Sequence, residues 1–386
     1  MKEIRFKEIL LSKYENIKEY FKKFKLTPNN INKKILVIDI GSHSTKGIVG
    51  KYENNKISIL NNFKISTPPN IYMDGKINDL LEIKECLKRA LQENEINIKS
   101  TICTIESSFV ISREITLPLI NKSDLEDMIY FEIAQYMPIE LEKYVIQYKF
   151  LENFIEDEIE KIRILAVALP REIASDIFEL LEFLDLTPIA LDLHSNGINK
   201  LINSSFHINN MNNKDTIAIL DLGHSHINVI IVEEGIYKFS RIIDLNEIDL
   251  NIISSNHLGL GLDNLQNISS VLDEIASAND LEDKSIYNNL SEINIHNIKF
   301  NIDTWIEQIN HVFKYYTSRN PTNVINNIFI YGGRANIKGL EEYMSNAFNI
   351  PTFKIKNIDN IDFINSQINE KDIVDYVNAI AALIRK

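Results

Sequence analysis

The chain contains the same short plan twice: an apolar run, an aspartate, one apolar residue, a glycine, a polar turn and a second apolar run. The two copies read VIDIGSHSTKGIV and ILDLGHSHINVII, and their aspartates, Asp39 and Asp221, lie 182 positions apart. An internal repeat at this distance predicts two related domains, each of which begins with a strand–turn–strand hairpin. Because it spans half of the chain, this repeat constrains the fold more than any other feature.

Each polar turn has the composition of an anion-binding loop. A glycine after a strand lets backbone N–H groups approach an anion closely, and hydroxyl side chains add short donors. An aspartate beside phosphates is repelled unless a divalent cation lies between them, and Mg²⁺ is often held by only one or two carboxylates. Two such tips that face each other across a cleft would hold a polyphosphate from both sides, with Mg²⁺ between Asp39 and Asp221. Lys46 would add a positive charge.

A third motif, NNIFIYGGRANIKGLEEYMSNAFNIP, predicts a strand, a Gly332–Gly333 turn and a helix that starts near Gly339. Glycines at that turn would let a flat purine ring lie against the backbone. A Gly-Gly pair after a strand is also typical of an ordinary strand–helix turn. Its place after two Asp-x-Gly hairpins favours the nucleotide interpretation.

Composition narrows the class of protein. A chain of 386 residues that is 45% hydrophobic can bury the cores of two or three domains. The net charge of −13 argues against a general nucleic-acid binder, which needs basic surface to neutralise phosphates. Its two cysteines, Cys86 and Cys103, form neither a disulfide framework nor a zinc pattern and suit a reducing cytoplasm. No stretch approaches the roughly 18 apolar residues that would cross a bilayer.

Two segments stand apart from the repeat. Residues 1–25 predict a basic amphipathic helix that either lies on an anionic membrane or a partner, or packs on its own domain. Residues 110–184 read as an inserted unit with a strand, a helix over 123–138, two strands around the acidic turn 152–161, and a helix over 171–185. His194, which follows this unit, is expected to be a structural or surface histidine without an apparent partner. Trp305 is expected to stand at the start of a helix and to be buried in the hydrophobic core.

The three motifs resemble the two phosphate-binding hairpins and the adenosine turn of the actin-like ATPase superfamily. Within it, the closest resemblance is to the PilM family of type IV pilus assembly proteins, which is related to the cell-division protein FtsA. The segments that carry this resemblance are SREITLPLINKSDLEDMIYFEIAQYMPI, LDLHSNGINKL, WIEQINHVFKYYTSR and YVNAIAALIRK. The inserted unit and its order favour this family over a kinase.

The resemblance implies an α/β chain with the actin-like (ribonuclease H-like) fold, in which two related domains surround a nucleotide cleft and the first carries an inserted α/β subdomain. The implied boundaries are a basic extension at 1–33, domain I at 34–212 with the insertion at about 106–185, and domain II at 213–386, whose closing helix 372–386 returns to domain I. The implied cofactors are ATP and Mg²⁺, the latter held through water by Asp39 and Asp221. The residues assigned to the cofactor are Asp39, Gly41, Ser42, Ser44, Thr45, Lys46, Asp221, Gly223, Ser225, Gly332, Gly333 and Arg334.

Similar PilM proteins are cytoplasmic and associate with the inner membrane through PilN, whose N-terminal cytoplasmic tail lies in a groove beside the inserted subdomain. Carried over, this implies a PilN-like partner bound with the help of segment 111–139, and a location at the inner face of the cytoplasmic membrane. Other pilus platform or motor proteins, self-association and a membrane contact through residues 1–25 stay open, and no nucleic acid is expected.

The chain departs from the family pattern in several places. The second hairpin has His224 and His226 where small or hydroxyl residues are usual, and Arg334 replaces a small residue of the adenosine turn. The Gly-Gly step expected after SRIIDL is missing, and no residue stands out to orient an attacking water. ATP binding with weak or absent hydrolysis is therefore expected. An FtsA-like division protein and a small-molecule kinase remain the alternatives.

Overall fold

The structure is a computed structural model of the chain, and it describes residues 33–119, 128–129, 131–135, 140–203, 207–209, 215–245, 288–364, 368 and 372–385. From 288 to 298 only the backbone helix is described. The N-terminal segment 1–32 and the segment that follows SRIIDL, 246–287, lie outside these residues, as do the predictions made for them. Within the described part, no helix is both long and apolar enough to cross a membrane.

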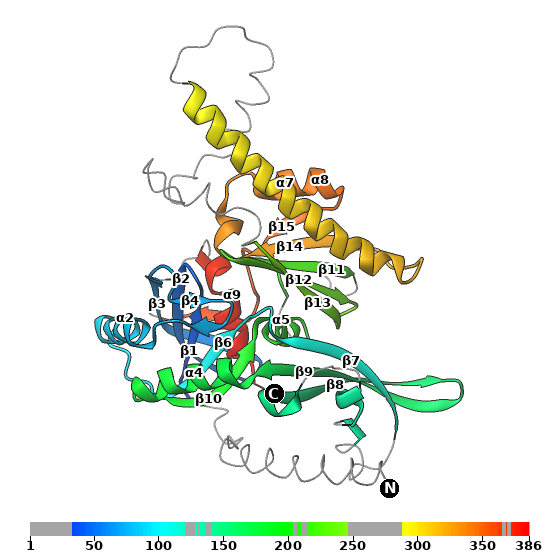
Figure 1. The fold of residues 1–386 in the computed structure, drawn as a ribbon, viewed down its shortest axis with the longest axis horizontal. Coiled ribbons are helices and arrows are strands. Elements are labelled where there is room, and N and C mark those ends of the chain that lie inside the picture. Colours follow the sequence, from blue (N-terminus) through cyan, green and yellow to red (C-terminus); the bar gives the residue numbers. More distant parts are fainter. Residues whose placement is uncertain are drawn as a thin grey trace.

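The first copy of the repeated plan forms the centre of a six-stranded sheet (Figure 1). Its strand order is β10-β6-β1-β2-β3-β16. The bounds are β1 (Ile35–Ile40), β2 (Ser44–Glu53), β3 (Lys56–Ser66), β6 (Ser100–Ile105), β10 (Thr187–Leu193) and β16 (Ile361–Phe363). β1 pairs antiparallel with β2 and parallel with β6, and β6 is parallel to β10. The predicted hairpin is therefore confirmed.

β1 is buried along its whole length, which explains why it is apolar almost throughout. Leu36 and Ile38 belong to a core that includes Ile83 of α2 (Leu80–Glu93), while Val37 belongs to a second core that includes Val377 of α9 (Ile373–Ala382). Alternate side chains therefore serve opposite faces of the sheet. Helix α2 starts at the N-cap Asp79, whose carboxylate accepts two backbone N–H bonds. A small hairpin, β4 (Tyr72–Met73) and β5 (Lys76–Ile77), precedes it.

The second copy forms the centre of a five-stranded sheet with the order β13-β12-β11-β14-β15. Its strands are β11 (Thr216–Leu222), β12 (His226–Glu233), β13 (Ile236–Asp244), β14 (Asn327–Tyr331) and β15 (Thr352–Lys354). The long helix α7 (Asn288–Ser318) and the shorter α8 (Leu340–Phe348) lie on the same side of this sheet in Figure 1. Trp305 of α7 is 6% exposed and packs in the core, as the sequence predicts.

The inserted unit forms a separate three-stranded antiparallel sheet in the order β7-β9-β8. Its elements are β7 (Ile111–Pro118), the 3₁₀ turn η1 (Leu141–Lys143), β8 (Tyr144–Glu156), β9 (Ile159–Pro170) and helix α4 (Arg171–Phe183). Of the predicted helix 123–138, residues 128–129 and 131–135 are described and helical, and Ile129 and Ile133 pack against the sheet. Asp157 and Glu158 turn the long β8–β9 hairpin with positive φ, which is typical of a two-residue turn.

Helix α9 connects the two large sheets. It packs against β1, β2 and β14, and against α5 (His194–Ile202), which follows β10. Its Val374 carbonyl accepts a hydrogen bond from the N–H of Gly332 at the end of β14 (3.0 Å). In Figure 1 this helix, drawn in red, lies between the two sheets. It therefore brings a C-terminal segment to the place where the two repeated hairpins meet.

Candidate functional site

The tips of the two repeated hairpins touch each other. Ser42 Oγ donates a hydrogen bond to Ser225 Oγ (3.2 Å), and the rings of His43 and His224 stack with their centroids 5.1 Å apart. The two turns also share one steric requirement. A Cβ atom on Gly41 would lie 2.8 Å from the carbonyl oxygen of Ser44, and a Cβ on Gly223 would lie 2.8 Å from that of His226. Glycine is needed at the same position of both turns because the backbone three residues on passes so close.

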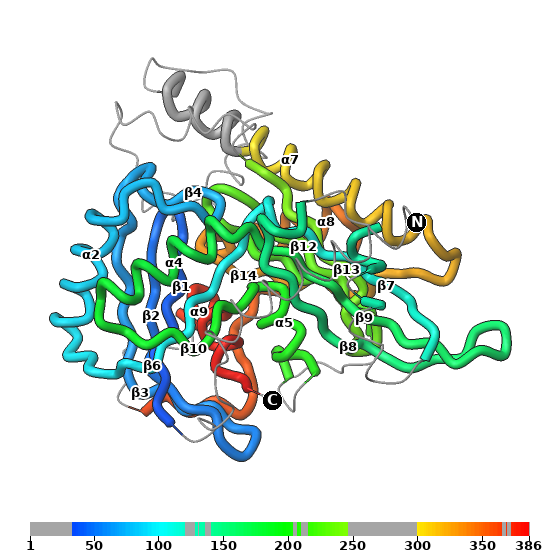
Figure 2. Tube along the Cα trace, turned by 60° about the horizontal axis from the view of Figure 1, so that its bottom comes forward, coloured from blue at the N-terminus to red at the C-terminus, as the bar shows by residue number. Residues whose placement is uncertain are grey.

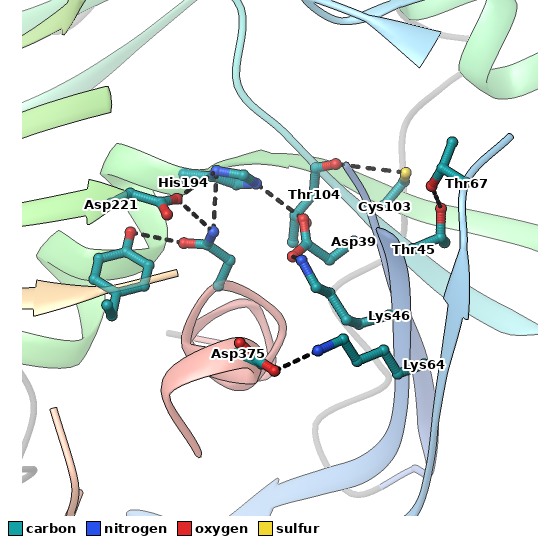
Figure 3. Close-up of polar contacts among 12 residues, drawn as sticks. Asp39, Thr45, Lys46, Lys64, Thr67, Cys103, Thr104, His194, Asp221 and Asp375 are labelled. Carbon is teal, nitrogen blue, oxygen red and sulfur yellow. Dashed lines mark hydrogen bonds and ion pairs between the residues drawn. The ribbon is translucent and has the colours of Figure 1, made fainter. Parts of the chain in front are cut away.

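Beneath the tips, His194 lies between the two repeated aspartates (Figure 3). Its Nε2 is 3.1 Å from Asp39 Oδ1, and its Nδ1 is 3.4 Å from Asp221 Oδ2. The His194 side chain is 11% exposed, and those of Asp39 and Asp221 are 5% and 12% exposed. A histidine at the start of α5 therefore joins the end of β1 to the end of β11.

The two carboxylates determine the charge of the ring. Burial alone would lower the pKa of His194, but hydrogen bonds to Asp221 and Asp39 and their negative charges outweigh burial and raise it to about 10. Burial alone would raise the pKa of Asp39, but the hydrogen bond and charge of His194, with Lys46 and Thr104, lower it to about 2. The ring is therefore positively charged at neutral pH.

Other side chains complete the polar network. Thr104 Oγ1 donates to Asp39 Oδ1 (2.8 Å), and Asn378 Nδ2 on α9 donates to Asp221 Oδ2 (2.8 Å). The same amide nitrogen lies 3.1 Å from His194 Nδ1, and its oxygen Oδ1 accepts a hydrogen bond from the Tyr331 hydroxyl (2.8 Å). Each carboxylate is thus satisfied by groups from more than one part of the chain.

A second polar contact joins the two large sheets. Glu106 follows β6, is 6% exposed and accepts hydrogen bonds at Oε2 from Asn228 Nδ2 (2.8 Å) and from the N–H of Ser195 (3.3 Å). Asn228 belongs to β12 of the five-stranded sheet. Burial raises the pKa of Glu106 to about 7, because the charged form loses its hydration.

The amino-acid sequence matches a known protein family. The sequence pattern of the family Type IV pilus assembly protein PilM matches residues 37–248, more than half of the chain. The chain belongs to the PilM family. It is therefore a type IV pilus assembly protein, and its fold is the actin-like ATPase fold.

Solved structures of similar fold accompany this family match. The PilM-PilN type IV pilus biogenesis complex matches with a TM-score of 0.68 and 14% identity, over 91% of this chain and 98% of that chain. The ethanolamine utilization protein EutJ from Carboxydothermus hydrogenoformans matches with a TM-score of 0.45 and 10% identity, over 95% and 98% of the two chains. MreB 5 of Spiroplasma citri, bound to AMPPNP, matches with a TM-score of 0.45 and 11% identity, over 91% and 95%.

Most residues of this PilM-family chain that the sequence analysis assigned to the cofactor lie around the tips of the two repeated hairpins. Ser44 and Lys46 lie at the start of β2, and Lys46 Nζ is 4.0 Å from Asp39 Oδ2. Thr45 is buried and its hydroxyl is 2.8 Å from that of Thr67, away from the carboxylates (Figure 3). Gly332 has a φ of 90°, and a Cβ there would lie 2.5 Å from Asp221 Oδ1. The end of β14 therefore lies close to Asp221.

The remaining two residues of the predicted adenosine turn differ from each other. Gly333 has open space around its missing Cβ. Arg334 is buried, its guanidinium lies 4.7 Å from the centre of the Trp305 ring, and Nη2 donates to the carbonyl of His224 (2.6 Å). Burial lowers the pKa of Arg334 to about 10. Arg334 therefore places a planar cation at the predicted adenosine turn.

The described arrangement does not accommodate a hydrated Mg²⁺ ion between Asp39 and Asp221. Mg²⁺ requires a near-octahedral shell of oxygen ligands, usually with several waters. The position between the two carboxylates contains the His194 ring instead, and the tips predicted to hold phosphates touch each other. Among the described residues, no group of three or more His, Cys, Asp or Glu could hold a metal ion. The assignment of ATP and Mg²⁺ to these residues stays a prediction.

His194 is a structural histidine, one of the two alternatives predicted, but its contact with Asp39 and Asp221 was not apparent from the sequence. The signal that could have found it is topological: β1, β6 and β10 are parallel, and their carboxyl ends carry Asp39, Glu106 and His194. Polar residues at the carboxyl ends of neighbouring parallel strands meet at one edge of the sheet. Sequence reasoning also missed Asn378, since α9 reads as an ordinary apolar closing helix.

Proposed function

We propose that this chain is an actin-like scaffold of type IV pilus assembly, or of a related secretion machine, that binds the N-terminal cytoplasmic tail of a PilN-like inner-membrane protein. Membership in the PilM family supports the pilus role. The observation that carries the tail-binding part is a groove lined by residues of the inserted sheet and of the six-stranded sheet. This groove is called the β8–α5 groove below.

The β8–α5 groove has a volume of about 1090 Å³, and its walls come from β8, β9, α4, β10 and α5. In Figure 2, α5 lies between the strands of the six-stranded sheet and the β8–β9 hairpin. β8 is an edge strand of the three-stranded sheet, and β10 is an edge strand of the six-stranded sheet. Sheet edges bind extended peptides by adding a strand, so the walls suit a flexible tail better than a folded domain.

The lining combines apolar surface with charged groups. Phe150 and Phe183 are 53% and 47% exposed at the groove. Arg385 reaches it from the C-terminal segment, and its buried Nε and Nη2 have no hydrogen-bond partner among the described residues. Such donors suit backbone carbonyl or carboxylate groups of an incoming peptide. Of the predicted groove segment 111–139, Ser112 is the only residue in the described part that lines this groove.

The test measures binding of a synthetic peptide with the sequence of the PilN-like tail from the same organism to the full chain. Phe150→Glu places a charge in the groove and is expected to weaken binding by about tenfold or more. The matched control is Ile155→Glu on the same strand, because Ile155 is 72% exposed and does not line the groove. Equal affinities of the two variants for the peptide contradict the groove assignment.

The proposed location of the chain in the cell follows from the proposed PilN-like partner. A chain that holds the cytoplasmic tail of an inner-membrane protein lies in the cytoplasm at the inner face of the membrane. Contact of residues 1–25 with lipid is an additional proposal, tested by whether deletion of residues 1–33 reduces the fraction bound to anionic vesicles. Equal binding of the full and shortened chains rejects it.

Nucleotide binding is a separate proposal. ATP with Mg²⁺ is the ligand that the sequence predicts for the two hairpins, and in the described arrangement it requires His194 to leave Asp39 and Asp221. A thermal shift on addition of Mg-ATP that is lost in the Asp39→Ala, Asp221→Ala double variant supports it. The same melting temperature with and without Mg-ATP rejects it and leaves the tail-binding proposal unchanged.

A further inference from the structure

The His194 contact crosses from one large sheet to the other. His194 is the first residue of α5 and directly follows β10 of the six-stranded sheet, whereas Asp221 lies on β11 of the five-stranded sheet. The ring is within 3.1 Å of Asp39 and within 3.4 Å of Asp221, and all three side chains are largely shielded from water. The contact therefore ties the two copies of the repeated hairpin at their base (Figure 3).

The two carboxylates depend on this ring. Thr104 and Asn378 each donate a hydrogen bond to one of them, but both groups are neutral. Lys46 Nζ is 4.0 Å from Asp39 Oδ2. Without the ring, Asp39 and Asp221 would be two buried carboxylates with no shared cation, an arrangement that disfavours the charged form of each and pushes them apart.

The contacts between the two hairpins continue from the carboxylates to the tips. Directly above them, Ser42 and Ser225 form a hydrogen bond and the rings of His43 and His224 stack. Glu106 forms a further contact between the two large sheets with Asn228. Together these contacts connect both hairpin tips with both strands beneath them.

We propose that the His194 ring takes the place of a divalent cation and its nucleotide. The ring holds Asp39 and Asp221 together and thereby keeps the two hairpins in contact. The two hairpins are then in contact without nucleotide, and Mg-ATP bound as proposed above would first have to displace the ring from the two carboxylates. This inference is independent of the β8–α5 groove, and it holds or fails whether or not the tail peptide binds.

Hydrogen exchange of the full chain tests this directly. The backbone amides of residues 40–46 and 222–228 are followed in EDTA without nucleotide, and again in Mg-ATP. The wild-type tips are expected to be protected in EDTA. In His194→Ala, exchange of both tips in EDTA is expected to rise by about tenfold or more, because one partner of a buried charge cluster is missing. The control is His311→Ala, since the His311 side chain is 64% exposed on α7, and it should exchange like the wild type.

Two results overturn the proposal. One is wild-type tips that exchange freely in EDTA and become protected only in Mg-ATP, which makes the nucleotide the closing group. The other is a folded His194→Ala variant whose tips are as protected as those of the wild type. If His194→Ala does not fold, His194→Gln replaces it under the same expectations, because one amide nitrogen cannot donate to both carboxylates in the geometry of the ring.

Discussion

Substitution of Glu106 by glutamine isolates the cost of one buried charge at the junction of the two sheets. Glu106 is 6% exposed, and its Oε2 accepts hydrogen bonds from Asn228 and from the backbone of Ser195. Glutamine has nearly the same shape and offers an oxygen to the same two donors. It cannot ionise, so the variant keeps the contact between β6 and β12 and removes the titration.

The magnitude and sign follow from the pKa. Burial raises the pKa of Glu106 from 4.5 to about 7, so between these values the folded chain keeps a proton that the unfolded chain has lost. The free energy of unfolding therefore falls as pH rises from 4.5 to 7, and the loss is complete above 7. A shift of this size corresponds to roughly 3 kcal/mol. Glu106→Gln should match the wild type near pH 4.5 and exceed its stability by about 3 kcal/mol at pH 8.

Urea denaturation at half-unit steps from pH 4.5 to 8 measures this difference. Trp305 is the single tryptophan and is buried, so its fluorescence reports unfolding around α7, while circular dichroism reports the whole chain. Other groups that titrate in this range, among them His224, are present in both proteins and cancel in the difference. A difference between variant and wild type that stays constant across this pH range would refute the reasoning.

Three further substitutions test the packing around the cleft by urea denaturation. Gly332→Ala should destabilise the chain by about 1–3 kcal/mol, because φ is 90° and the new Cβ would lie 2.5 Å from Asp221 Oδ1; an unchanged midpoint contradicts this. Tyr331→Phe should cost about 1–3 kcal/mol because the buried Asn378 oxygen loses its donor, whereas the control Tyr315→Phe, on an exposed ring, should cost almost nothing. Gly47→Ala should cost about 1–3 kcal/mol because its Cβ would meet the Phe63 ring at 2.0 Å, and Phe63→Leu should restore part of that loss; additive effects would count against the steric explanation.

The repeated hairpins could be predicted because their signals are local. Apolar runs that end in Asp-x-Gly appear twice in the sequence, and each copy formed two paired strands with a glycine that the turn requires. The two strands of the inserted unit and the acidic turn between them could also be predicted, and the structure shows them as the β8–β9 hairpin. In these segments the pattern within about a dozen residues determines the element.

The polar network of the cleft could not be predicted in the same way. His194, Asn378 and Tyr331 come from three distant elements, and each is an unremarkable residue in its own segment. Their meeting depends on how α5, α9 and β14 pack, which no local pattern contains. Arg334 was visible as a departure from the family pattern, but its position against Trp305 depends on the packing of α7 on the five-stranded sheet.

Site-specific photo-crosslinking to the tail peptide tests the central claim most directly. The full chain carries benzoylphenylalanine in place of Phe150 in one sample and in place of Ile155 in another, and each is irradiated with the synthetic PilN-like tail. Phe150 lines the β8–α5 groove and Ile155 does not, although both are exposed on β8. The account predicts a covalent adduct with the peptide from position 150 and little from position 155. Peptide that binds the chain but forms no adduct from position 150 contradicts the proposal that this groove holds the tail.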